Sequence, residues 1–280
     1  MINRNHVIGI IVLAVLISCA TPISAQDVEA KDDAKAGMKA DKTGTNPINF
    51  TFDLRAYNEF QWLNTEGDGS QNVSTLEYRM PILDGKWQFR TRARGTSLRA
   101  DFNDDGHYDI DKCGLGEVDF RFLTVPFVDM SKMQAWAFGF ETFLPTADDA
   151  LGSERLSFGP QVFFAQFNPF GLKGFMFAPG YQHKFSVYEE SDNDRLHQGI
   201  IDLYVLWASA DKQYWALLDP QIIIDYEESV EFCIIDLEVG TMLDKYLGTK
   251  GHSVYVRPSI CIGFDRPTDA SIEVGYKIVW

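Results

Sequence analysis

Large apolar and polar residues alternate through the last stretch of the chain. The apolar positions are Ile272, Val274, Tyr276, Ile278 and Trp280, and the positions between them are Glu273, Gly275, Lys277 and Val279. A period of two places these sets on opposite faces of a β-strand. One face suits lipid and the other suits water, although the last strand of a soluble β domain would show the same alternation.

The same period recurs from residue 48 onward, in stretches separated by short polar segments. One stretch alternates Ile48, Phe50 and Phe52 with polar residues, and Asp84-Gly85 is a typical two-residue hairpin signal. Most stretches run about 9–12 residues, which is the length of a tilted membrane-crossing strand and longer than the usual strand of a β-sandwich. The segments 99–115, 145–154 and 189–198 are predicted to be loops.

These patterns predict an all-β chain, a transmembrane antiparallel up-and-down β-barrel of about twelve strands. Ten or fourteen strands remain open, because one late hairpin is ambiguous. An even count places both ends of the barrel on the periplasmic side, and the last strand is expected to pair with the strand that begins near Ile48. Residues 47–280 form the predicted barrel.

The N-terminus has the features of a targeting segment. Arg4 precedes an apolar run from Val7 to Ile17, and small residues follow up to Ala25. This order predicts a secretory signal peptide over residues 1–25. A second interpretation is a lipoprotein cleavage site that leaves Cys19 lipidated. Residues 26–46 lack aromatic side chains and are rich in Asp, Lys and Ala, which predicts a disordered periplasmic tail.

Composition narrows the function classes. Lys and Arg number 25 against 40 Asp and Glu, which gives a net charge of -15. Nucleic acid is therefore not an expected partner, because phosphate binding needs a basic face. Aromatic residues make up 14% of the chain, as the interfacial girdles of a Gram-negative outer-membrane barrel require. The expected partners are outer-membrane lipid, the barrel-assembly machinery and a small-molecule solute.

Charged residues alternate with the apolar ones, so in a barrel they face the lumen. They form a basic strip on one wall and a more acidic opposite wall, with a transverse field between them. The set is Arg90, Arg92, Arg94, Arg121, Glu117, Asp119, Asp202, Asp219, Asp225, Asp236, Glu238, Arg257, Glu273 and Lys277. Two interpretations stay open: a strip that biases passage of anionic solutes, or a wall stiffened by ion pairs.

One loop resembles the start of a calcium-binding loop. Asp101, Asn103, Asp105 and Asp109 supply oxygens at alternating positions, and a glycine allows the sharp turn. Lys112 stands where the chelating Glu is expected, so a solvated acidic loop is the other interpretation. No cofactor other than Ca²⁺ is predicted.

No catalytic residues are predicted, and the chain is not expected to be an enzyme. A membrane hydrolase needs a nucleophile beside a placed histidine. His183 is the only histidine predicted within a strand, and no serine accompanies it convincingly.

The second half of the chain resembles a known family. The motifs are Glu141-Thr142-Phe143-Leu144-Pro145-Thr146, Leu151-Gly152-Ser153, Asp219-Pro220-Gln221 and Arg257-Pro258. They are similar to transporter-type outer-membrane proteins associated with the meta-pathway of phenol degradation. Ala147 replaces the glycine that often follows in that family. The resemblance implies a barrel and uptake of small aromatic or apolar compounds, and it supplies no catalytic residues.

The chain is therefore predicted to form an outer-membrane channel or transporter for passive passage of small solutes. A structural or adhesive surface barrel with an occluded lumen, and a soluble periplasmic β protein, are the alternatives. In the barrel interpretation Tyr276, Ile278 and Trp280 form the signal that the assembly machinery recognises.

Overall fold

The computed structural model describes residues 44–45, 48–65, 67–101, 108–148, 150–153, 155–189, 195–264 and 266–280. The chain divides into two units, Met1–Lys39 and Ala40–Trp280, and all described residues belong to the second. The predicted signal peptide, Cys19 and most of the predicted tail lie outside the described residues, as do Asn103 and Asp105 of the calcium motif.

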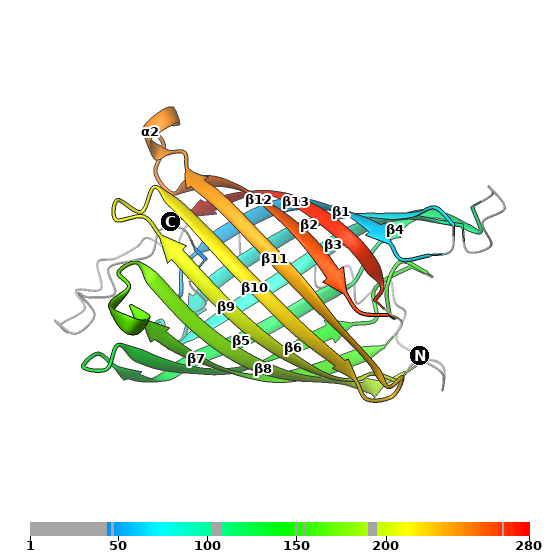
Figure 1. Ribbon diagram of the computed structural model, residues 1–280, viewed down its shortest axis with the longest axis horizontal. Helices are drawn as coiled ribbons and strands as arrows, with labels where there is room; N and C mark the ends of the chain where they lie inside the picture. Colours follow the sequence, from blue (N-terminus) through cyan, green and yellow to red (C-terminus); the bar gives the residue numbers. More distant parts are fainter. Residues whose placement is uncertain are drawn as a thin grey trace. The chain divides into compact units, whose positions relative to one another are not determined.

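The described residues of the second unit form a closed antiparallel sheet of long, tilted strands (Figure 1). The strands are β1 (Asp53–Leu63), β2 (Gly69–Ile82), β3 (Trp87–Ala100), β4 (Ile110–Leu115), β5 (Val118–Asp129), β6 (Gln134–Leu144), β7 (Leu156–Phe167), β8 (Phe175–Tyr188), β9 (His197–Ala208), β10 (Tyr214–Asp225), β11 (Val230–Met242), β12 (His252–Ile262) and β13 (Thr268–Val279). Twelve of them form the ring, and β4 adds to β3 outside it. The predicted twelve-stranded barrel is confirmed.

The last strand closes the barrel against the first. β13 pairs with β1 from Asp53↔Val279 to Leu63↔Thr268, and the Trp280 amide donates to the Phe52 carbonyl at 3.0 Å. The predicted pairing of the last strand with the first is confirmed, but the first strand begins at Asp53 and not near Ile48. Closure leaves no free sheet edge in the ring, which removes the unpaired backbone groups that lipid could not satisfy.

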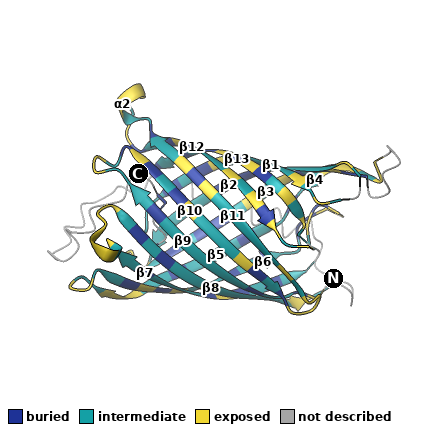
Figure 2. Ribbon diagram, in the orientation of Figure 1, coloured by how far each residue is buried: buried dark blue, intermediate teal, exposed yellow. Residues whose placement is uncertain are grey.

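Burial alternates along the strands, as Figure 2 shows. In β13 Glu273 and Lys277 are buried inside the ring, whereas Ile272 and Val274 are exposed on its outer surface. Large apolar side chains are likewise exposed on the outside of other strands, among them Trp62, Trp136 and Phe138. Water would make such a surface unfavourable, and a hydrocarbon environment removes that cost.

The two ends of the barrel carry different connections. At the end that holds Trp280, β2 and β3 join through the tight turn 83–86, where Asp84 and Gly85 both have positive φ. The predicted loop 99–115 is wrong in part, because β3 continues to Ala100 and β4 forms a hairpin arm with it. The arm escaped prediction because Ile110–Leu115 has charged residues where alternation would place apolar ones.

Short helices occur only in the turns of the described residues. The 3-10 helix η2 (Pro169–Gly171) lies between β7 and β8, and α2 (Asp244–Leu247) lies between β11 and β12. Neither is long and apolar enough to cross a membrane. Lys245 of α2 bonds Asp211 of the neighbouring turn at 2.9 Å, and this hydrogen bond lowers the pKa of Asp211 and raises that of Lys245.

Candidate functional site in the barrel lumen

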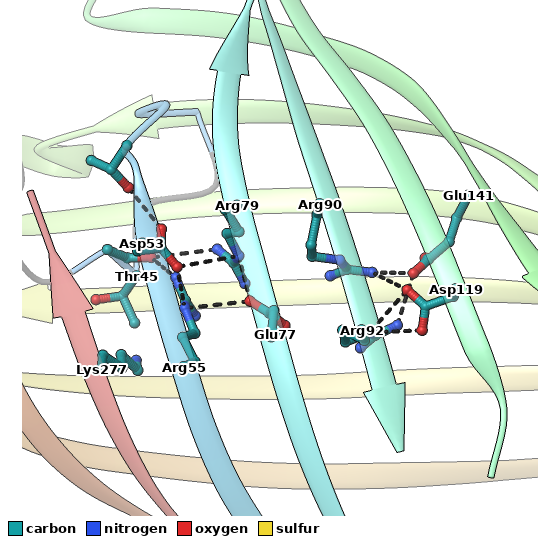
Figure 3. Close-up of polar contacts among 12 residues, drawn as sticks. Thr45, Asp53, Arg55, Glu77, Arg79, Arg90, Arg92, Asp119, Glu141 and Lys277 are labelled. Atoms are coloured by element: carbon teal, nitrogen blue, oxygen red, sulfur yellow. Dashed lines mark hydrogen bonds and ion pairs between the residues drawn. The ribbon is translucent and has the colours of Figure 1, made fainter. Parts of the chain in front are cut away.

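Inward-facing arginines and carboxylates interlock on adjacent strands near the end that holds Trp280. Arg55 of β1 bonds Asp53 at 2.7 Å and lies 3.3 Å from Glu77 of β2. Arg79 bonds the same Glu77 at 2.5 Å. Asp53, Arg55 and Glu77 are buried, so each charge depends on these partners for compensation (Figure 3).

A second network continues the wall across β3, β5 and β6. Arg92 bonds Asp119 at 2.9 Å and Glu141 at 2.8 Å, and Arg90 contacts Glu141 (Figure 3). Arg94 bonds Asp119 at 2.7 Å. Asp119 is fully buried among these arginines. The predicted arginine ladder is therefore present on the inner face, and its charges are largely paired.

A third network lies on the far side of the closing seam. Lys277 and Glu238 are both fully buried and are 2.7 Å apart, and the Trp215 indole donates to the same Glu238 oxygen at 2.7 Å. Arg257 contacts the other oxygen of Glu238. Three donors thus converge on one carboxylate inside the wall.

Glu273 and two further predicted residues also face inward, each with a different partner. Glu273 accepts a bond from the Tyr255 hydroxyl at 2.6 Å. Asp225 accepts one from Gln198 at 2.8 Å, at the end of β10. Glu117 lies just before β5 and accepts a bond from Ser153 at 2.7 Å. These contacts tie polar side chains to the wall.

Three carboxylates form an acidic ladder on neighbouring strands. Asp219 of β10 pairs directly with Asp236 of β11, and Asp202 of β9 lies diagonally across from Asp219 on the same face. The side chains of Asp202 and Asp219 are within hydrogen-bonding reach of each other. No basic residue of the described part of the chain makes an ion pair of 4 Å or less with any of the three.

A cavity of about 300 Å³ opens between the arginine networks and the acidic ladder. Arg90, Arg92 and Arg121 line one side, and Asp202 and Asp219 line the other. The structure thus brings residues of β3, β5, β9 and β10 to one space in the lumen. Their placement gives the cavity a basic side and an acidic side, as expected for a transverse field.

Two residues before the first strand also lie against the inner wall. The Gly44 carbonyl accepts bonds from Arg55 and Arg79, and the Thr45 carbonyl accepts one from Tyr204. Both residues are buried, although they fall within the segment 26–46 that the sequence predicts to be a tail. These contacts use backbone carbonyls, so the pattern of side chains in the sequence could not predict them.

No protein family model and no curated protein matches the chain. Solved structures do match it. An outer membrane channel from Pseudomonas putida F1 aligns with a TM-score of 0.63 over 84% of this chain and 97% of that chain, at 10% identity. The chain has the fold of an outer-membrane channel. The NanC porin aligns with a TM-score of 0.52 over 81% of this chain and 98% of that chain, at 11% identity.

Identities this low establish the fold alone. The predicted closed β-barrel, with the fold of outer-membrane channels, is therefore confirmed, whereas the family suggested by the motifs of the second half stays a prediction. The predicted assembly residues lie on the outer surface: Trp280 is 63% exposed, and the Tyr276 hydroxyl contacts His252. Their role as an assembly signal stays a prediction.

Several residues of the site were missed by sequence reasoning. Glu141 occupies the same inward face as Ala137 and Gly139 of β6, so the alternation along this strand could have predicted that Glu141 faces the lumen. Gln161 of β7 gave no such signal, because it is neither charged nor part of a motif. The prediction that His183 alone lies in a strand is wrong, since His197 begins β9 and His252 begins β12. His197 lies 3.0 Å from His183.

Proposed function

We propose that this protein is a channel in the outer membrane of a Gram-negative bacterium, for passive passage of small solutes. The observation that supports this proposal is the charged cavity inside a closed barrel whose outer surface is apolar. The apolar outer surface is compatible with lipid, and the charged lumen interacts favourably only with polar or charged solutes. The fold likeness to outer-membrane channels agrees with this assignment.

The lining chemistry favours polar solutes within this proposal. Small aromatic or apolar compounds follow from the family resemblance alone, and such solutes would have to displace water from paired charges without replacing its hydrogen bonds. Phe163 and Ile200 line the same cavity and offer a limited apolar surface. The polar class is therefore the better supported of the two.

A second candidate is a surface barrel with an occluded lumen. Gly44 and Thr45 favour it, because their carbonyls occupy donors of the inner wall that a solute would otherwise use. A channel requires that water and ions pass these residues. The two candidates differ in conductance, so one measurement separates them.

Planar-bilayer recording of the purified, folded protein tests the proposal. A channel gives discrete current steps that depend on protein insertion, and liposomes containing the protein swell in a small neutral solute. Protein denatured by boiling serves as the control for detergent leakage. Insertion confirmed by gel migration, together with zero conductance and no swelling, would establish the occluded barrel instead.

Calcium binding at the loop from Asp101 to Lys112 is a separate proposal. It rests on the spacing of Asp101, Asn103, Asp105 and Asp109. Calorimetric titration with Ca²⁺ tests it, and Asp105→Asn should weaken binding at least tenfold if the motif holds the ion. Equal heats for both proteins would remove the proposal.

A further inference from the structure

The cavity in the lumen is lined by side chains with polar atoms that have no partner among the described residues. The donors are Arg90 Nε, Arg121 Nε, Gln161 Nε2 and Arg257 Nε, and the acceptors are Asp202 Oδ1 and Asp219 Oδ1. All six side chains line the same cavity of about 300 Å³. Buried polar groups in native proteins are nearly always hydrogen-bonded, so six unpaired groups around one cavity favour a polar ligand there.

Arg121 and the acidic pair belong to different sides of the cavity, and Gln161 lies between them along the wall. Arg121 lies on β5 and Gln161 on β7, whereas the acidic pair lies on β9 and β10. The Gln161 side chain is itself buried, at 8% exposure. A ligand that satisfies both sides must therefore accept hydrogen bonds at one end and donate them at the other.

Neighbouring charges sharpen this division. Arg90 and Arg92 also line the basic side, but Asp119 and Glu141 already neutralise them. Arg121 makes no ion pair of 4 Å or less with any described carboxylate, and it is the arginine left for a ligand. A simple anion would leave the Asp202–Asp219 pair unpaired, and a simple cation would leave Arg121 unpaired.

We infer that this cavity is a binding station for small zwitterions, molecules that hold an ammonium and a carboxylate a few atoms apart. The carboxylate accepts from Arg121 and Gln161, and the ammonium donates to Asp202 and Asp219. The volume lies at the lower end of the range for small-molecule sites, which limits the ligand to a compact one. The inference rests on the proposed function and names the solute class of that channel.

Four isosteric probes separate the charge classes in proteoliposome uptake: L-alanine (zwitterion), L-lactate (anion), L-alaninamide (cation) and L-lactamide (neutral). At low solute concentration, uptake of alanine should exceed that of each of the others by about fivefold. Because the four molecules have nearly the same size and shape, a size filter cannot produce this order.

Substitutions should change the order rather than the overall rate. Arg121→Gln removes the carboxylate partner, so alanine uptake falls to the level of alaninamide. The double variant Asp202→Asn/Asp219→Asn removes the ammonium partner, so lactate becomes the preferred probe. Arg99→Gln is the control, because Arg99 lies on the exposed arm and should leave the order unchanged. Heat-modified gel migration verifies that each variant is folded.

Two outcomes overturn the inference, and they differ. Normal ion conductance with equal uptake of the four probes, or variants that scale all four equally, refutes the zwitterion station and leaves the channel intact. Absence of both ion conductance and uptake in the folded wild-type protein refutes the proposed function, and the inference with it.

Discussion

The convergence of Lys277, Arg257 and Trp215 on Glu238 makes that carboxylate the most consequential charge in the wall. Glu238 and Lys277 are both fully buried, and their charged atoms are 2.7 Å apart. Glu238→Gln would leave Lys277 without its counter-charge in a low-dielectric wall, and Arg257 would keep only Glu273, at 3.7 Å. Removing one partner of a buried ion pair costs about 3–5 kcal/mol, because the other charge stays desolvated.

This cost lowers the folding equilibrium constant by about two to three and a half orders of magnitude. Lys277→Met should cost less than Glu238→Gln, because Glu238 retains Arg257 and the Trp215 indole as donors. The order of the two variants is the sharper part of the prediction. It follows from the geometry and not from the total charge removed.

Reversible urea unfolding in lipid vesicles, followed by tryptophan fluorescence, measures the free energies. Asp111→Asn is the matched control, because its ion pair with Arg99 has a length of 3.2 Å and both side chains are 57% exposed. Exposed pairs contribute about 0–1 kcal/mol. If Glu238→Gln destabilises the barrel no more than Asp111→Asn does, then burial does not increase the contribution of this network to the free energy of unfolding.

Three further predictions concern the seam, the wall and a turn. Deletion of Trp280 should reduce the amount of folded barrel in outer membranes more than it alters solute preference, and unchanged assembly would contradict the assigned role of the terminal aromatic. Gly275→Ala should destabilise the barrel by about 1–3 kcal/mol, because a Cβ there would lie 2.1 Å from the Tyr255 ring. Gly95→Ala is the control in the same unfolding assay, because a Cβ at Gly95 meets no atom within 4 Å. The Asp211 carboxyl should titrate below its ordinary pKa in NMR, because Lys245 bonds it. The stabilisation from this bond is present above the ordinary pKa and is lost as the pH falls through the lowered pKa. Lys245→Met should move the titration back toward the ordinary pKa.

Period-two alternation predicted an all-β chain, about twelve strands and the inward facing of most charged residues. The reason is physical: a one-residue slip would expose Glu273 and Lys277 to lipid, so the pattern itself fixes which face is inside. The pairing of β13 with β1 followed for the same reason. Strand length distinguished a membrane barrel from a sandwich, because only a membrane crossing requires such long strands.

The partners of the charges could not be predicted from one sequence. Arg90 contacts Glu141, which lies two strands away across β5, and that contact depends on the stagger of the strands around the barrel. Gly44 and Thr45 bond through their carbonyls, which every residue has. The unpaired donor of Gln161 became meaningful only when the topology placed it on the same cavity as Asp202.

The ion pairs of the arginine wall have a consequence for the electrical behaviour of the lumen. Arg92 is held by Asp119 and Glu141 from two other strands, so its guanidinium cannot change rotamer without breaking bonds on both sides. Exposed side chains change rotamer within picoseconds to nanoseconds, whereas a doubly anchored one stays in place. In the proposed channel, an ion that crosses the barrel would pass an Arg92 charge that stays in place, and the open-state current should show little excess noise.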